Sequence, residues 1–117
     1  MSVLKKKSET CEEQLRRMCK DIADSISEPL ERTDGETGEK RTETAIDWMG
    51  GVYDIRYLVD SRKRYMGAEL LVAGGGPTVW VDTWRGQVKG WWGGDKVIEN
   101  FADNLGLDDY CEEMYGY

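Results

Sequence analysis

Histidine is absent from this 117-residue chain. Histidine is the side chain that most often moves protons near neutral pH, and it is the commonest zinc ligand. Ser–His–Asp triads, Cys–His dyads and histidine-based metal centres are therefore excluded within the chain. Long apolar runs are absent as well. The longest uncharged apolar stretch, residues 70–76, falls far short of the roughly 18 residues expected of a membrane-spanning helix, so we expect no membrane partner.

Signals for secretion are also scarce. Three lysines at residues 5–7 are followed by charged residues, where a signal peptide needs an apolar stretch of about 7–15 residues. The three cysteines, Cys11, Cys19 and Cys111, are an odd number without Cys-x-x-Cys spacing. Extracellular disulfide frameworks normally use an even set. We therefore expect a protein of the reducing cytoplasm.

Composition sets the scale of the fold. The chain is long enough for one domain, residues 1–117, with a small core. Because 39% of the residues are apolar, disorder is not expected from composition. The formal net charge of −7 disfavours direct binding of nucleic acid, since charge repulsion acts at long range. We expect a soluble acidic domain.

The apolar periodicity predicts helices at both ends of the chain. Residues 8–30 show apolar side chains at spacings of three and four, and Thr10 with Glu13 fits a capping box. Cys11 and Cys19 belong to this apolar stripe, which predicts that they are small buried residues. Residues 107–114 predict an acidic C-terminal helix.

Between these helices the sequence predicts a linker and a sheet. Residues 31–43 contain no large apolar residue and predict a flexible charged linker, and residues 44–49 favour one or two helical turns. From residue 52 the apolar period changes to two, so residues 52–92 predict an antiparallel meander of three to four strands. Residues 96–104 remain ambiguous. The expected fold class is α+β, with the helices packed on one face of the meander.

Two patterns bear on catalysis. The glycine loop at residues 73–77 lacks the Lys and Ser/Thr of a phosphate-binding loop and opens no helix, so we interpret it as a strand connection. Asp54, Glu69 and Asp82 lie on neighbouring expected strands, as do the Mg²⁺ ligands of many nucleases. The acid-x-Lys triplet that accompanies such acids is missing from the second and third strands. We favour solvent-facing acids with no metal and no cofactor, and keep a small metal-dependent nuclease as an alternative.

Five tryptophans lie within residues 48–92, which is many for a chain of this length. Trp91 and Trp92 are adjacent on an expected strand, so their side chains point to opposite faces of the sheet. One of them, together with Trp84 in its turn, is expected to be partly exposed. Exposed tryptophan is enriched at protein interfaces. The alternative is that these rings lie flat across a small sheet.

The negative charge is concentrated at one end of the chain. Residues 1–94 hold 15 basic and 16 acidic side chains, a balance of −1, whereas residues 95–117 hold one basic and seven acidic, a balance of −6. The acids of the expected C-terminal helix and its approach include Asp103, Asp108, Asp109, Glu112 and Glu113. Like charges four apart on a helix destabilise it by a few tenths of a kcal/mol per pair, about 0.2–0.5. One use of such a surface is to imitate a row of phosphates, and the alternative is a solubilising face.

Three segments resemble a group of small acidic proteins encoded by bacterial phages and mobile elements. They are AGGGPTVWVDT at residues 73–83, VKGWW at 88–92 and LGLDDYCEEMY at 105–115. Members carry a "CGGP-aromatic-VDT" strand, a "WW" strand and an acidic C-terminal helix, and here Gly74 stands where the cysteine is expected. The resemblance implies a phage or mobile-element protein acting in a host bacterial cell. Some proteins of this setting are anti-CRISPR proteins, which block RNA-guided nucleases by occupying their basic channels.

Together these features favour a non-enzymatic inhibitor. We expect it to bind a basic host protein, such as a CRISPR effector nuclease, by nucleic-acid mimicry. The residues expected to bind this partner are Asp103, Asp108, Asp109, Glu112, Glu113, Trp84, Trp91 and Trp92. The alternatives are the metal-dependent nuclease and a homodimeric accessory protein whose partner surface is its own sheet.

Overall fold

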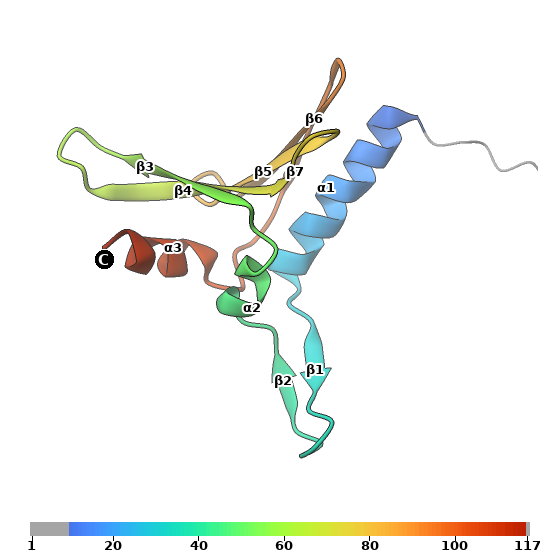
Figure 1. Ribbon diagram of the computed structural model, residues 1–117, viewed down its shortest axis with the longest axis vertical. Helices are drawn as coiled ribbons and strands as arrows, with labels where there is room; N and C mark the ends of the chain where they lie inside the picture. Colours follow the sequence, from blue (N-terminus) through green and yellow to red (C-terminus); the bar gives the residue numbers. More distant parts are fainter. Residues whose placement is uncertain (1–9, 117) are drawn as a thin grey trace, which may run out of the picture.

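The computed structural model describes residues 10–116, so the lysines at 5–7 and residues 8 and 9 of the expected helix lie outside the described residues. The elements are α1 (Cys11–Ser27), β1 (Glu31–Thr33), β2 (Lys40–Thr42), α2 (Ala45–Met49), β3 (Asp54–Val59), β4 (Tyr65–Ala73), β5 (Thr78–Asp82), β6 (Gln87–Trp92), β7 (Asp95–Asn100) and α3 (Leu107–Tyr115). The fold class is α+β, as predicted (Figure 1). Within the described part, no helix is long and apolar enough to cross a membrane.

The central sheet has five strands, not three to four. Its order is β3-β4-β5-β6-β7, and every neighbouring pair is antiparallel. The fifth strand, β7, follows a turn at Gly93 and Gly94, where Gly93 adopts a φ of +61°. Its sequence does not alternate cleanly, because Glu99 shares the helix-covered face with buried Val97. The meander therefore extends beyond residue 92 into the segment that the periodicity left ambiguous.

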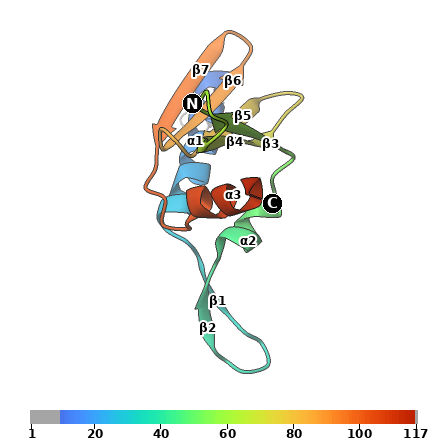
Figure 2. The ribbon, with the colours of Figure 1, turned by 90° about the vertical axis from the view of Figure 1, so that its left-hand side faces the viewer.

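Residues 31–43, which the sequence predicts to be a flexible charged linker, form a hairpin. β1 and β2 pair antiparallel over three residues each. Between them the Asp34 carboxylate accepts the backbone N–H of Glu36 at 2.8 Å and of Thr37 at 3.4 Å, and Gly38 adopts a φ of +71°. Turn chemistry thus organises a segment that has no large apolar side chain. The hairpin projects from the rest of the molecule (Figures 1 and 2).

Helices α1 and α3 pack on one face of the sheet, as predicted, and α2 lies on the same side against α3 (Figures 1 and 2). Helix α1 crosses β6 and β7, and α3 lies against β4. The buried apolar residues between the layers are Leu15, Cys19, Ala23, Ile26, Ala45, Ala68, Leu70, Val79, Val81, Val88, Val97, Leu107 and Cys111. Gly90 on β6 sets the approach of α1, since a Cβ there would lie 2.6 Å from Cys19 Sγ and 2.7 Å from Leu15 Cδ1.

Local capping explains where α1 begins. The Thr10 hydroxyl accepts the backbone N–H of Glu13 at 3.1 Å, and so satisfies one of the free donors at the helix start. The helix ends at Ser27, two residues before Pro29. Cys19 is buried as predicted, but Cys11 is exposed because it lies in the first turn, beyond the contact with the sheet.

Candidate functional site

The structure separates the residues that the sequence grouped into one site. Helix α3 lies on the helix-covered face of the sheet (Figure 1). Trp91 pairs with Lys96 on the opposite face, and Trp92, one residue later, packs against the core beneath α1. Trp84 follows β5 and also lies on the opposite face, against Gly67. One small interface therefore cannot contact both the acidic helix and the two exposed tryptophans.

Asp108 is used inside the fold. Its carboxylate accepts a hydrogen bond from the Tyr65 hydroxyl at 2.8 Å and another from the Thr83 hydroxyl at 2.8 Å. The Thr83 oxygen in turn accepts the backbone N–H of Ala68 at 2.9 Å. Burial raises the pKa of the Tyr65 hydroxyl, which keeps the donor protonated. Asp108 thus joins α3 to β4 and to the turn after β5, and its carboxylate is engaged rather than free for a partner.

Asp103 has a second structural role, at the start of α3. Its carboxylate accepts the backbone N–H groups of Gly106, Leu107 and Asp108 at 2.8–2.9 Å. These are donors that a helix start leaves without partners, and the residue directly before α3, Gly106, has no side chain to accept them. The negative charge of Asp103 also complements the helix dipole. Two of the five predicted acidic binding residues therefore stabilise the fold.

Three acids of α3 remain on the surface: Asp109, Glu112 and Glu113 are exposed. Within residues 10–116 no ion pair involves any of them. The end of α3 lies beside a basic turn, because the Tyr115 hydroxyl donates to the carbonyl of Lys63 at 2.7 Å. The acidic surface is consequently smaller than the sequence predicts, and it borders positive charge.

The face opposite the helices, here called the outer face, carries a different set of side chains. Among the described residues no helix packs on it (Figures 1 and 2). The strand register places one row across four strands, with Leu71 opposite Trp80, Trp80 opposite Lys89, and Lys89 opposite Ile98. Trp84, Trp91 and Ile98 expose 49%, 37% and 41% of their surface. The outer face is therefore a broad aromatic and aliphatic surface of a sheet.

Each tryptophan associated with the outer face carries a cation. The Arg56 guanidinium lies 4.4 Å from the ring centre of Trp80, and the Lys96 amine lies 5.6 Å from that of Trp91. The Arg85 guanidinium lies 4.7 Å from the ring of Trp84. These are cation–π distances, within about 6 Å of the ring centre. Sequence reasoning missed Trp80, Arg56, Arg85 and Lys96, although the alternation along β5 and β6 was a signal that could have found Trp80.

Asp82 anchors the turn that positions Trp84. Its carboxylate is 2% exposed and accepts the backbone N–H groups of Trp84 and Arg85, both at 2.9 Å. It also forms ion pairs with Arg85 at 3.0 Å and Lys89 at 2.9 Å. Burial raises the pKa of Asp82, but the Arg85 N–H and the Lys89 and Arg85 side chains lower it by more, so the net pKa lies below its ordinary value. Asp82 is an ionised, fully engaged turn anchor.

The three carboxylates of the nuclease alternative do not assemble. Glu69 lies directly opposite Asp82, but Asp54 is placed opposite Leu71 and accepts the N–H of Ile55. Among residues 10–116 there is no group of three or more Cys, Asp or Glu side chains that could hold a metal ion. The arrangement therefore supplies no reason to propose a metal-dependent nuclease.

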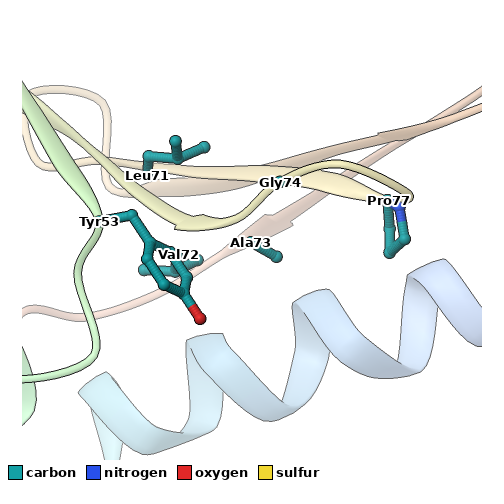
Figure 3. A pocket seen from close by; sticks show the side chains of 6 residues that line it. All are labelled: Tyr53, Leu71, Val72, Ala73, Gly74 and Pro77. Atoms are coloured by element: carbon teal, nitrogen blue, oxygen red, sulfur yellow. The ribbon is translucent and has the colours of Figure 1, made fainter.

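Open hollows lie beside α1, and two of them adjoin the sheet. One, of about 320 Å³, lies between α1 and Trp92. The other, of about 380 Å³, lies beside the glycine loop, and Figure 3 shows Tyr53, Val72 and Pro77 pointing toward α1 there. Leu71 points to the other side of the sheet. The hollow beside the glycine loop has no charged residue in its lining. The hollow beneath α1 is lined by Gln14, Arg17 and Asp21 as well as by Met18, Ile22 and Trp92.

The outer face thus combines exposed aromatic rings with charged side chains. Comparison of the chain with protein-family models, with curated proteins and with solved structures finds no match.

Proposed function

We propose that the protein is a non-enzymatic binding module that contacts a partner protein through its outer face. The observation that carries this proposal is the exposure of Trp84 and Trp91 on a sheet face that no helix of residues 10–116 covers. Exposed aromatic residues that form one surface are typical of interaction sites, where tryptophan often contributes most of the binding energy.

The charges on the outer face indicate the chemistry of that partner. Arg56, Arg85 and Lys96 lie over indole rings, although the whole chain carries a net charge of −7. The outer face therefore combines apolar contact area with cations over its indole rings. It also carries Glu69 and Asp82, and Asp82 is paired with Arg85 and Lys89. Complementary charges favour encounter and fix orientation more than they add affinity. A partner segment that carries carboxylates beside apolar side chains fits this surface.

Affinity capture with matched variants tests the proposal. The intact chain, Trp84→Ala, Trp91→Ala and the control Ile46→Ala are immobilised, and proteins bound from a bacterial lysate are quantified by mass spectrometry. Ile46 is 67% exposed and belongs to α2, away from the outer face. We expect a partner whose capture falls at least about tenfold in both tryptophan variants, and is unchanged in Ile46→Ala. Equal capture by all four proteins would contradict the proposal.

Helix α3 supports a second candidate function. The exposed carboxylates of Asp109, Glu112 and Glu113 recur at helical spacings of one, three and four, so they form one acidic surface. Such a surface suits the inhibition of a basic nucleic-acid-handling protein, such as a CRISPR effector nuclease, by nucleic-acid mimicry. This candidate and the outer face require partners of opposite charge, so one set of variants separates them.

Replacing the three α3 acids by serine tests the mimicry. The matched control replaces Asp21, Glu36 and Glu39 by serine, which changes the net charge equally at exposed sites elsewhere. If α3 acts as a mimic, inhibition of nuclease cleavage is lost in the α3 variant and kept in the control. Inhibition that survives in the α3 variant, or that falls equally in both, rules the mimicry out.

A further inference from the structure

The two edges of the central sheet differ in character. β3 and β7 are the edge strands, so each has backbone N–H and C=O groups that no strand of residues 10–116 pairs on the outer side. In β7, four of the six residues are polar or charged, which is the usual protection of an edge against pairing. In β3, four of the six are apolar or aromatic, and its burial is low throughout.

The exposed apolar side chains of the molecule concentrate at the β3 edge. Tyr53, just before the strand, is 77% exposed, and Tyr57, Leu58 and Val59 are also exposed. A long exposed apolar edge is a template for pairing with another strand. The charges that interrupt it are Asp54 and Arg56, two residues apart and therefore on the same face.

We propose that β3 pairs antiparallel with β3 of a second copy of this chain, and so joins two five-stranded sheets into one. Registers that keep both sets of helices on one side are separated by their charges. Centring on Arg56 sets two guanidinium groups opposite each other, and centring on Tyr57 sets Asp54 opposite Asp60 of the second copy. Centring on Leu58 sets Arg56 opposite Asp60, but Asp60 lies beyond the end of β3 and already accepts from the Arg64 guanidinium at 2.9 Å. Centring on Ile55 sets Asp54 opposite Arg56 of the second copy, twice, and Tyr53 opposite Tyr57. Opposite charges across a strand pair are favourable and like charges are not.

The register centred on Ile55 therefore specifies the partner as the chain itself. The strand supplies both halves of each charge pair, as an interface with twofold symmetry requires. In the single chain Arg56 lies over Trp80, two strands in from the edge, and the Asp54 carboxylate accepts the backbone N–H of Ile55 at 2.9 Å. Pairing exchanges these two contacts for the Asp54–Arg56 ion pairs and frees the Ile55 N–H for the new strand. In the joined sheet the two outer faces lie on the same side and present their tryptophans together. The pairing rests on the edge alone and stands whether or not the outer face binds a partner.

Sedimentation equilibrium of the full chain across protein concentrations tests the pairing with charge reversal. Asp54→Arg alone and Arg56→Asp alone each set like charges opposite each other, and the double variant Asp54→Arg/Arg56→Asp restores opposite charges. We expect each single variant to raise the dimer dissociation constant at least about tenfold, and the double variant to return it to within about threefold of the parent. The control Lys40→Asp reverses an exposed charge on β2, away from both the β3 edge and the outer face, and leaves dimerisation unchanged.

Far-UV circular dichroism shows whether each variant is folded, so that a loss of dimer is not confused with unfolding. A chain that remains monomeric up to about 1 mM overturns the proposal. So does a dimer that the single reversals leave intact, or one that Lys40→Asp weakens as strongly as they do. A dimer broken only by Trp84→Ala or Trp91→Ala would assign the self-association to the outer face and also overturns pairing at β3.

Discussion

Replacement of Gly90 by alanine tests how closely α1 packs on the sheet. The added Cβ would lie 2.6 Å from Cys19 Sγ and 2.7 Å from Leu15 Cδ1. Packed heavy atoms approach to about 3.5–4.0 Å, so α1 has to move by about 1 Å. Overpacking of this kind costs about 1–3 kcal/mol. Alanine also restricts the unfolded chain, which offsets about 0.4–1 kcal/mol. We expect a net loss of about 1–2 kcal/mol in the free energy of unfolding.

Urea unfolding followed by tryptophan fluorescence measures this loss. The midpoint concentration should fall while the slope of the free energy against urea is unchanged, because the surface exposed on unfolding is the same. The thermal midpoint should fall by about 4 °C for each kcal/mol. Gly94→Ala is the control, since nothing lies within 4 Å of its added Cβ. A Gly90→Ala protein as stable as the parent would refute the close packing of α1 on β6.

Coupling to Leu15 gives an independent check of the same contact. Leu15→Ala alone removes a fully buried side chain and should cost about 2–5 kcal/mol. In the Gly90→Ala background it should cost less, by an interaction energy of about 0.5–3 kcal/mol, because the smaller side chain makes room for the new methyl group. Strictly additive losses would show that the two side chains do not meet.

Three further predictions concern single groups. Asp103→Ala removes the acceptor of three N–H groups at the start of α3 and should lower the free energy of unfolding by about 1–2 kcal/mol in urea, whereas an unchanged value would contradict its capping role. In the native protein, a thiol reagent should modify exposed Cys11 rapidly and buried Cys19 and Cys111 slowly, because burial raises the pKa of Cys19 to about 11 and that of Cys111 to about 12. Equal rates for all three thiols would contradict this. The pKa of Asp82 is lower in the folded than in the unfolded state. The difference in free energy of unfolding between the parent and Asp82→Asn should therefore be largest above about pH 4 and become smaller as the pH falls below it. A difference that does not depend on pH would contradict the ion pairing.

Elements with a clear apolar periodicity could be predicted from the sequence. The hairpin, which is held by turn hydrogen bonds, and the edge strand β7 could not. The stripe from Leu15 to Ile26 identifies α1 because every member faces the same sheet. The periodicity did not predict β7, because Glu99 lies on the helix-covered face at the rim of the sheet. Its carboxylate still reaches water there, so a charged residue stands where the alternation requires an apolar one. The β1–β2 hairpin was not predicted, because the turn residues Asp34 and Gly38 hold it together and no buried apolar side chain marks it in the sequence.

The candidate site could be predicted only in part, for a different physical reason. The exposure of Trp84 was predicted from its place in a turn, and the opposite directions of Trp91 and Trp92 from strand alternation. Both predictions are confirmed. The structural use of Asp108 depends on Tyr65, 43 residues away in the chain, so no local pattern reveals it. A count of charges treats an engaged carboxylate and a free one alike, which is why the acidic surface was overestimated.

Thr83 connects helix α3 to the backbone of Trp84 on the other side of the sheet. Its hydroxyl bonds to Asp108 of α3, and its peptide unit continues directly into Trp84 on the opposite side of the sheet. A displacement of α3 therefore reaches the backbone of Trp84 through a single hydrogen bond. We therefore expect a ligand that displaces α3 to change the surroundings of Trp84, a side chain that the ligand does not touch.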